Sequence, residues 1–589
     1  METLKTRWAE QAKCDCPLND YPRPQMVREK WVCLNGMYDY AVTDENCTAF
    51  PAKANGLIRV PFALESSLSG VCRHLKPNER LWYRRKFNAE KTAGRLLLHF
   101  EAVDWECNIF INGKEAGFHR GGYLPFAIDI TDLVTDGENE LVVKVYDPTE
   151  AHWQSRGKQV SKSTGFWYTA TSGIWQTVWM ETVPENYINK YKLTPDIDKG
   201  VFRIETDIVG EGSLHISVFD EGNVIVDADI GTDCEIAIPD AKLWSPETPF
   251  LYDFTLELRT SDTTDKVLGY VGMRKFGIAN DESGLPRLTL NNKPYFQKGL
   301  LDQGYWSDGG LTAPTDEAMI YDIETMKRLG FNMLRKHIKV EPARWYYHCD
   351  KIGMIVWQDM VSGGKALNPI HAGVIPNISG VLSPVYNLTL SDGKKRYGIF
   401  GRTQEENRNE YYRELLEMID TLYSFTSIGC WVPFNEGWGQ FDAKVAYDKI
   451  REVDATRVID HASGWYDQKG GDLKSVHKYI LPVVTPKKDG RPFVLSEYGG
   501  YSQILDGHVW NKARSFGYMM YMSKDKLSKA YKKLHEKQVI PQIKKGLCAT
   551  VYTQVSDVEF EVNGMLTYDR EIVKIDEQTI IDINKQLTY

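Results

Sequence analysis

Residues 295–337 read "YFQKGLLDQGYWSDGGLTAPTDEAMIYDIETMKRLGFNMLRKH" and predict a strand, a helix and a second strand in that order. The runs YFQKGLL and NMLRKH have the length and pattern of buried strands. Between them, residues 316–329 space their apolar side chains as an amphipathic helix does. A strand, a helix and a strand in succession predict one parallel βαβ unit.

The same unit repeats toward the end of the chain. Eight segments are candidate strands: YFQKGLL, NMLRKH, MIVWQDM, IGCWVPFNE, RVIDHAS, KSVHKY, FVLSEYGG and ATVYTQVSD. Helical patterns separate several of them, for example at residues 405–422. Eight βα units over residues 283–589 predict a TIM barrel, whose functional residues lie at the carboxyl ends of its strands. A long irregular segment, residues 362–401, follows the third strand, and we expect it to form part of the wall of the site.

The sequence before the barrel is built from short alternating runs separated by Gly, Asn and Asp. The pair Asn112-Gly113 lies between two such runs and predicts a β-hairpin. Residues 185–282 contain the candidate strands LHISVFD, LWSPETPFLYDFTLEL and KVLGYVGMRKFGI. A block of roughly 100 residues with this spacing favours an immunoglobulin-like sandwich.

Composition limits the class of partner. The 71 Lys and Arg against 80 Asp and Glu give a formal net charge of −9, without a basic run dense enough to follow a phosphate backbone, so we expect no nucleic acid partner. Aromatic residues make up 12%, which suits either carbohydrate-stacking surfaces or β-rich cores. No segment is apolar enough to span a bilayer, and the polar amino terminus predicts a soluble, cytoplasmic protein, although a secreted protein trimmed of its signal would read the same. The sequence is compatible with a homo-oligomer and does not decide the oligomeric state.

The ten cysteines show no common zinc spacing, and no H-E-x-x-H cluster is present. We therefore expect free thiols, no metal in the chemistry and no cofactor.

Two glutamates end candidate strands of the barrel. Glu436 follows the fourth strand in "WVPFNEGWGQ", and Glu497 ends the seventh in "FVLSEYGG". A barrel brings both to one rim, and paired carboxylates that flank one bond are the equipment of glycoside hydrolysis. Either glutamate alone could be structural, and the Asn-Glu pair before glycines could cap a helix.

These residues and the segments around them resemble glycoside hydrolase family 2, the β-galactosidase, β-glucuronidase and β-mannosidase family. In the first domain the similar segments are GGYLPFAIDIT and TSGIWQTVWMETV. In the barrel they are GFNMLRKHIKVEPARWYYHCDKIGMIVWQDM, FNEGWGQFD, VLSEYGG and VYTQVSDVEFEVNGMLTYDR. The resemblance covers nearly the whole chain, and it implies a sugar-binding jelly roll over residues 1–184.

The resemblance also implies roles for the residues at the strand ends. Glu436 would be the acid/base and Glu497 the nucleophile. Asn435 matches the asparagine that contacts the sugar 2-hydroxyl, and Tyr479 the tyrosine that hydrogen-bonds the nucleophile. An ordinary half-buried barrel tyrosine is the alternative for Tyr479.

Other strand ends supply supporting candidates. Arg335 and His337 would form a cationic floor near Glu497, or else a structural salt bridge and a core histidine. Further candidates for sugar hydroxyls are Asp359, His461, His477 and Gln554. Trp438 and Trp465 could stack on a sugar face or line the core.

The sequence departs from the family's pattern at three places. Trp167 stands where the galactosidase and glucuronidase patterns carry an Asp, which leaves open whether the first domain contacts substrate. Near residues 563–565, "NGM" lacks the lysine that holds a glucuronide carboxylate. The segment "QDMVSGGK" lacks the Glu and His that bind magnesium in the large galactosidases.

The paired acids and the resemblance imply a retaining mechanism. The departures favour exo-action on a terminal neutral β-linked sugar, with galactose-configured glycosides expected first. The alternatives are a β-glucuronidase, a β-mannosidase, an α-L-arabinopyranosidase or an inactive carbohydrate-binding relative. An acidic sugar would need a cation from elsewhere in the chain, such as Lys365 or Lys478.

Overall fold

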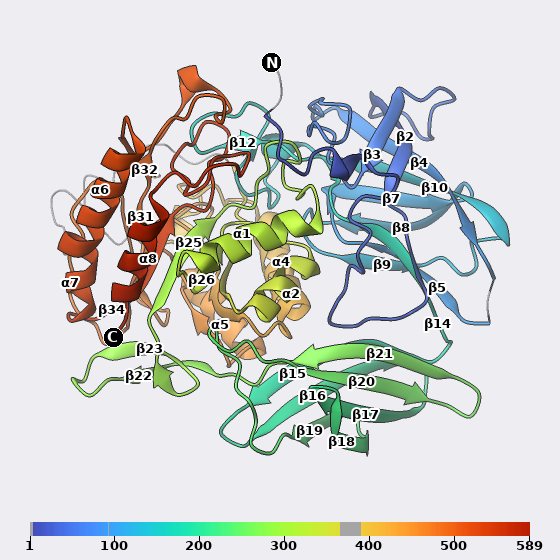
Figure 1. The fold of residues 1–589 in the computed structure, drawn as a ribbon. Helices are drawn as coiled ribbons and strands as arrows, with labels where there is room; N and C mark the ends of the chain where they lie inside the picture. The colour runs from blue at the N-terminus through green and yellow to red at the C-terminus, as the bar shows by residue number, and fades with distance from the viewer. Residues whose placement is uncertain (1–3, 92, 366–389) are drawn as a thin grey trace.

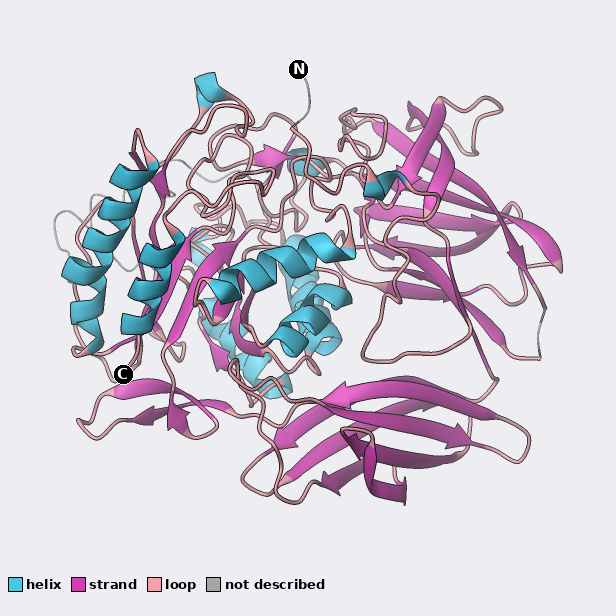
Figure 2. Cartoon of the chain, viewed as in Figure 1, coloured by secondary structure: helices cyan, strands magenta, loops and turns pink. Residues whose placement is uncertain are grey.

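The structure is a computed structural model that describes residues 4–91, 93–365 and 390–589. Figure 1 shows two β-sandwiches, in blue to cyan and in green, packed around one side and the base of a barrel. The α-helices gather around the barrel, whereas the two sandwiches are built from strands (Figure 2). The fold class predicted from the sequence, a jelly roll, an immunoglobulin-like sandwich and a TIM barrel, is confirmed.

The first domain packs a six-stranded antiparallel sheet against a four-stranded one. The six strands are, in spatial order, β3 (Gly56–Val60), β2 (Gly36–Asp44), β4 (Glu79–Ala89), β10 (Gly137–Tyr146), β7 (Glu106–Ile111) and β8 (Lys114–Arg120). The four are β1 (Trp31–Cys33), β14 (Val178–Val183), β5 (Arg95–Phe100) and β9 (Phe126–Asp129). The predicted hairpin joins β7 to β8 and is confirmed, since Asn112 and Gly113 have φ of 51° and 76°, as a type I′ turn requires.

The second domain packs a sheet of three strands against a sheet of four. The strands are β15 (Tyr187–Asp196), β16 (Val201–Val209) and β19 (Asp233–Ala237), then β18 (Asn223–Ile230), β17 (Ser213–Asp220), β20 (Tyr252–Arg259) and β21 (Thr264–Val271). The predicted strand KVLGYVGMRKFGI is divided, because the chain leaves the sandwich after β21 to contact the barrel. Arg274 Nε donates to the carbonyl of Thr426 at 2.9 Å. The remainder forms β22 (Phe276–Asn280), which pairs with β23 (Pro286–Leu290) and, through it, β24 (Lys293–Pro294).

The third domain is a curled sheet of eight strands in which every pair is parallel. Its spatial order is β29 (Val458–Ile459), β28 (Ile428–Val432), β27 (Ile355–Asp359), β26 (Met333–Lys336), β25 (Gln297–Asp302), β34 (Leu547–Thr553), β31 (Phe493–Gly499) and β30 (Lys474–Lys478). Each overlaps one of the eight predicted segments, although β34 begins before its segment, at Leu547, and β25 ends after its own, at Asp302. The α-helices are α1 (Asp316–Arg328), α2 (Ala343–Ile352), α4 (Glu405–Leu422), α5 (Ala443–Val453), α6 (Lys524–Leu534), α7 (Ile540–Ile543) and α8 (Glu577–Gln586).

Residues 155–169, here called the jelly-roll arm, cross from the first domain to the carboxyl end of the barrel. The backbone N–H of Gly157 donates to the carbonyl of Ser362 at 2.9 Å, just after β27. The arm contains the short strands β11 (Gln159–Val160) and β12 (Tyr168–Thr169), and Figure 1 shows β12 above the barrel. At its far end the N–H of Thr169 donates to Glu559 Oε1 at 2.8 Å. The first domain therefore contributes to the face where the candidate acids lie.

Shorter pairs complete the fold: β6 (Val103–Asp104) with β13 (Gly173–Ile174), and β32 (Tyr501–Ser502) with β33 (Met519–Met520). Most of the predicted wall segment, namely residues 366–389 of 362–401, lies outside the described residues. Within the described ranges, no helix is both long and apolar enough to cross a membrane.

Candidate active site

The sequence predicts Glu436 at the end of its strand, but in the structure it lies just beyond the last residue of β28. The strand stops at Val432 because Pro433 has no N–H to continue the ladder. Glu436 itself has a left-handed φ of 51°, and its N–H donates to the carbonyl of Ser463 at 2.9 Å. The next helix, α5, begins only at Ala443, so Glu436 caps no helix. A tethered, strained turn thus presents this side chain to the barrel's carboxyl end.

Glu497 lies inside strand β31 and is held by two donors. Arg335 Nη1 donates to its Oε1 at 3.1 Å, and the hydroxyl of Tyr479 donates to its Oε2. Tyr479 lies just after the neighbouring strand β30, whereas Arg335 comes from β26, which does not pair with β31. The predicted proximity of Tyr479 and Arg335 to Glu497 is therefore present in the structure.

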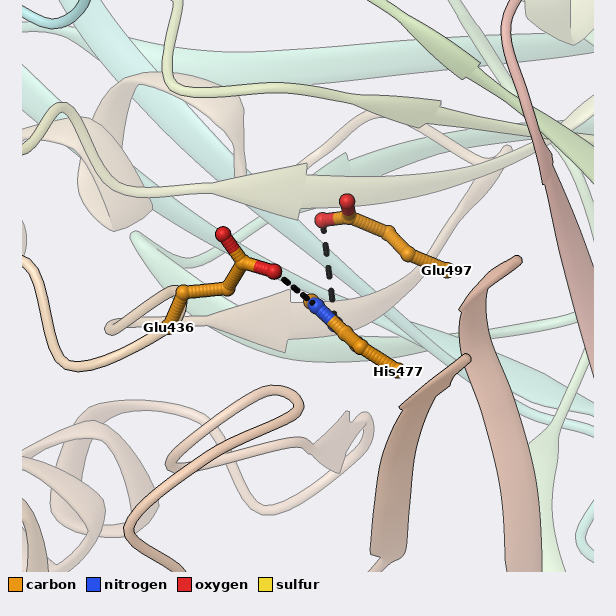
Figure 3. A group of neighbouring side chains, drawn as sticks. All are labelled: Glu436, His477 and Glu497. Carbon is orange, nitrogen blue, oxygen red and sulfur yellow. Dashed lines mark hydrogen bonds and ion pairs between the residues drawn. The ribbon is translucent and has the colours of Figure 1, made fainter. Parts of the chain in front are cut away.

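His477 lies between the two acids and contacts both (Figure 3). Its Nδ1 is 2.8 Å from Oε1 of Glu436, and its Nε2 is 3.7 Å from Oε1 of Glu497. The nitrogen and the carboxylate oxygens of this trio lie within 4.8 Å of one another. His477 was expected to meet sugar hydroxyls, whereas here it links the two carboxylates.

The environments of the two acids shift their pKa values in opposite directions. Burial raises the pKa of Glu436, and the negative charge of Glu497 adds to the rise, although the hydrogen bond with His477 opposes it. Burial alone would also raise the pKa of Glu497, but the charges of His477 and Arg335 outweigh it and lower this pKa to about 2. A proton shared by the pair is thus expected on Glu436 rather than on Glu497.

Arg335 organises the floor beneath Glu497. Its guanidinium is fully buried and donates to both carboxylate oxygens of Asp359, at 2.9 and 3.0 Å. The same group donates to Oδ1 of Asn435 at 2.8 Å, and His337 Nδ1 lies 2.8 Å from Asp359 Oδ2. Asp359 is therefore occupied as a partner of two basic groups, and Asn435 is fixed next to the acid that follows it.

Two candidates are engaged with other partners than the acids in the part of the chain that the structure describes, and a third makes only a backbone hydrogen bond there. His461 packs under the loop that follows β29, where its Nε2 accepts from the N–H of Gly470 at 3.3 Å. Gln554 is fully buried, and both ends of its amide are used, by Gln303 and Asn563 at 2.8 Å each. Trp465 is half-buried, and its backbone N–H donates to the carbonyl of Ser463. Pattern matching placed these residues at strand ends but could not give their side-chain directions.

Aromatic side chains from two domains meet beside the acids. Trp438 stacks on Trp167 of the jelly-roll arm, with ring centroids 4.8 Å apart and planes at 13°. Tyr479 stacks in turn on Tyr518, with centroids 3.9 Å apart. The residue that replaces the family's Asp, Trp167, therefore belongs to the wall of the site.

The sequence analysis missed Lys158 and Tyr518. Lys158 lies on the jelly-roll arm, with its ammonium 5.9 Å from the ring centroid of Trp438. Nothing near either residue in the sequence signals a role, because both reach the site through contacts between distant segments. Of the cations suggested earlier, Lys365 is exposed. Lys478 lies between His477 and Tyr479 on β30, so strand alternation directs its side chain away from the acids.

The trio of Glu436, His477 and Glu497 is also a group that could hold a metal ion by the proximity of its ligand atoms. In the described structure His477 already pairs with Glu436, and Glu497 accepts from Arg335 and Tyr479. A cationic arginine on a ligand oxygen opposes cation binding. The absence of a catalytic metal stays a prediction.

Three family models match the chain in the order of its domains. The model described as "Glycosyl hydrolases family 2, sugar binding domain" matches residues 69–184. "Glycosyl hydrolases family 2" matches residues 186–274, and "Glycosyl hydrolases family 2, TIM barrel domain" matches residues 286–575.

Individual relatives carry different names. A "Putative beta-glucuronidase" of Formosa agariphila is 25% identical over 454 residues, which are 72% of this chain and 51% of that protein. A "Beta-galactosidase" of Lactococcus lactis is 29% identical over 305 residues, 49% of this chain and 28% of that protein. The chain thus spans about half, or less, of the length of these curated relatives. The solved structure of a β-D-glucuronidase of Dictyoglomus thermophilum superposes with a TM-score of 0.73 at 16% identity, covering 96% of this chain and 98% of that one, which shows a shared fold.

Proposed function

Because the chain belongs to glycosyl hydrolase family 2, we propose that it cleaves the β-glycosidic bond of a terminal sugar with retention of anomeric configuration. One observation carries the proposal: an oxygen of Glu436 and an oxygen of Glu497 lie within 4.8 Å. Retaining glycosidases hold their carboxyl groups about 5–5.5 Å apart, and inverting ones about 6.5–9.5 Å. The short separation favours direct attack on the sugar over attack by an intervening water.

In the first step, a carboxylate oxygen of Glu497 attacks the anomeric carbon while Glu436 gives its proton to the glycosidic oxygen. The carbon–oxygen bond to the leaving group breaks, and a glycosyl ester forms on Glu497. In the second step, Glu436 takes a proton from water, and the water oxygen displaces Glu497 from the anomeric carbon. The opposite pKa shifts of the two acids suit these two roles.

The neighbouring side chains prepare the acids for these steps. Arg335 and Tyr479 keep Glu497 ionised and oriented, and His477 orients Glu436 through Oε1. Asn435, fixed by Arg335, is the proposed partner of the sugar 2-hydroxyl. Since both carboxylates and their partners are assembled, an inactive carbohydrate-binding relative is the weaker alternative.

The observations that bear on the identity of the sugar favour two different classes, neutral and acidic. The missing lysine near Asn563 and relatives named β-galactosidase favour the neutral, galactose-configured sugar expected from the sequence. The relative named as a putative β-glucuronidase favours an acidic sugar. Aryl β-galactoside, β-glucoside, β-mannoside, β-glucuronide and α-L-arabinopyranoside, assayed in parallel, separate these substrates.

The stereochemistry of the first-formed product tests the proposed mechanism. An NMR time course with the best aryl β-glycoside of that panel should show the β-anomer of the free sugar first, followed by slow mutarotation. If the α-anomer appears first, a water must attack in a single displacement, and the two-step mechanism is wrong.

A further inference from the structure

We propose that Lys158 of the jelly-roll arm is a specificity-determining residue, whose ammonium binds a carboxylate on the sugar, so that the site prefers a β-linked uronic acid. This inference rests on the proposed function and names its substrate class. Under this inference the first domain takes part directly in substrate recognition. It does so through Lys158 and not through the family's Asp, whose position Trp167 occupies.

The arm places Lys158 directly against the barrel. The preceding residue, Gly157, has a φ of 63°, and a Cβ at its position would come within 2.9 Å of the carbonyl oxygen of Ile338. Ile338 follows His337 at the carboxyl end of β26. The carbonyl of Lys158 accepts from the N–H of Tyr168 at 3.0 Å, which fixes the backbone from the other side of the arm. Lys158 is thus held at the rim on which the acids lie.

The side chain of Lys158 points toward the candidate site. Its Nζ lies 5.4 Å from the ring centroid of Tyr168 and 5.9 Å from that of Trp438, two positions after Glu436. The ammonium is close enough for its charge to act on both Glu436 and His337. A carboxylate that meets this ammonium would therefore belong to a ligand of the same site.

The ammonium has no counter-ion in the described residues. Lys158 is 8% exposed, yet its Nζ makes no hydrogen bond or ion pair within the described ranges. The two aromatic rings stabilise the charge in part, but they accept none of its three N–H donors in the way an oxygen does. The Nζ atom is not among the fully enclosed polar atoms that lack a partner in the described residues, so its donors stay open to a ligand. An anionic group on the substrate would supply the counter-ion.

A second buried donor nearby also lacks a partner. Trp438 is 7% exposed, and its Nε1 has no hydrogen bond to any described residue. The Lys158 ammonium lies 5.9 Å from the centroid of the ring that carries this N–H. Two donors without partners so near each other favour an acceptor with several lone pairs, such as a carboxylate. The buried Arg335 is not available for this purpose, since Asp359, Asn435 and Glu497 occupy it.

The region where the family pattern holds a glucuronide carboxylate is differently occupied. The Nδ2 of Asn563 donates to Glu561 Oε1 at 2.9 Å, and its Oδ1 accepts from Gln554 Nε2 at 2.8 Å. Glu561 also accepts the hydroxyl of Tyr168. A carboxylate of the substrate would meet a buried acidic side chain there, so Lys158 is the better-placed cation.

The test compares two substrates that differ only at carbon 6, an aryl β-D-galacturonide and the matching β-D-galactoside, with the matching β-D-glucuronide and β-D-glucoside as a second pair. Wild-type kcat/KM should be higher for the uronide of at least one pair. In Lys158→Met, which keeps the length and removes the charge, the uronide-to-neutral ratio should fall by about 10- to 100-fold, the usual worth of a charged hydrogen bond. Using the ratio cancels any general effect of the lysine on Glu436.

Two further variants make the comparison specific. Lys162→Met removes an exposed lysine from the same arm and should leave the ratio unchanged. Lys158→Arg keeps the charge and should retain part of the uronide preference. Calorimetric binding of free galacturonate and glucuronate gives a readout that needs no turnover, and Lys158→Met should weaken it by at least about 10-fold. Thermal melting checks that each variant is folded.

The outcomes separate this inference from the proposed function. If hydrolysis depends on Glu497 but wild type prefers the neutral sugar of both pairs, the inference is wrong and the function stands. The inference is also wrong, and the function stands, if Lys158→Met lowers kcat/KM equally for both substrates of a pair and leaves uronate binding unchanged. If Glu497→Ala keeps full activity on every glycoside, the proposed function itself is wrong.

Discussion

At the scale of single residues, Glu436 and Glu497 show how neighbours make one residue type serve two purposes. Glu497 is buried and Glu436 is partly exposed, and the loss of hydration at each by itself favours the protonated form. Glu497 faces a fully buried arginine, whereas Glu436 meets a histidine and the negative charge of its partner acid. The division of labour between acid and nucleophile is therefore set by what surrounds each carboxyl group.

The pH dependence of activity should follow these two pKa values. Activity needs Glu497 ionised and Glu436 protonated. As pH rises through the raised pKa of Glu436, kcat/KM should fall, and on the acid side it should fall only toward pH about 2, where Glu497 takes up a proton. An alkaline limb that persists in Glu436→Ala would contradict the assignment of that limb to this residue.

The separate roles of the acids can be tested with leaving groups. Glu436→Ala should lose about 10²- to 10⁴-fold in kcat/KM with a poor leaving group, and far less with an acidic phenol, which needs no protonation. Added azide should then restore turnover of that variant and give a β-glycosyl azide. If azide instead gives the β-glycosyl azide with Glu497→Ala and the inverted α-azide with Glu436→Ala, the roles are exchanged.

At the scale of elements, the jelly-roll arm and strand β30 position the side chains of the site. On β30 and just beyond it, His477 and Tyr479 both reach the acids, and Lys478 between them points the other way. The arm lies against the barrel because Gly157 lets its backbone approach the end of β26 closely. A side chain at that position would push the arm, and Lys158 with it, away from the acids.

Two glycines of the arm provide a matched test of this contact. Gly157 and Gly165 have similar positive φ values, 63° and 57°, but a Cβ on Gly165 would meet nothing within 4 Å. Gly165→Ala should cost only the conformational penalty of about 1–2 kcal/mol and leave kcat/KM unchanged. Gly157→Ala should destabilise more and also lower kcat/KM. Equal effects of both substitutions on kcat/KM would show that the close approach of the arm does not matter for activity.

The barrel elements were predictable, but the contacts made by the arm were not. Residues 316–328 and the eight strands follow local patterns of apolar spacing and length, which the sequence displays directly. Glu497 could be placed for the same reason, since it lies within a strand. The turn that displaces Glu436 beyond β28 depends on Ser463, and Tyr168 meets Glu561 across 393 positions. Such pairings depend on how whole domains pack, and local sequence patterns do not reveal that packing.

At the scale of the whole molecule, the site depends on how the domains are held together. The segment that precedes β1 contacts all three of them. Thr6 donates to Asp308 of the barrel domain at 2.7 and 2.8 Å, and Arg28 binds Asp265 of the second domain and Glu181 of the first. Since the arm reaches the acids from another domain, these ties also keep Lys158 and Trp167 in register with the barrel.

Arg28 should be one of the most sensitive positions outside the site. Its guanidinium is 5% exposed and pairs with Asp265 at 2.8 Å and Glu181 at 3.2 Å. Arg28→Met would leave two buried carboxylates without this partner and should lower the free energy of unfolding by about 3–5 kcal/mol. Arg203→Met breaks an exposed pair with Asp233 inside the second domain and should change it little. Denaturant titration measures both, and equal losses would contradict the importance of burial at Arg28.

The most direct test of the mechanism is to trap the glycosyl-enzyme. A 2-deoxy-2-fluoro β-glycoside with a good leaving group, made with the sugar that the enzyme hydrolyses fastest, should inactivate it, because the second step becomes slower than the first. Digestion and mass spectrometry should then find one sugar per chain. It should be on the peptide that contains Glu497, bound to Glu497 itself. A label on Glu436 or on any other residue would contradict the assignment of Glu497 as the nucleophile. Steady hydrolysis of this compound with no adduct formed would contradict the two-step mechanism.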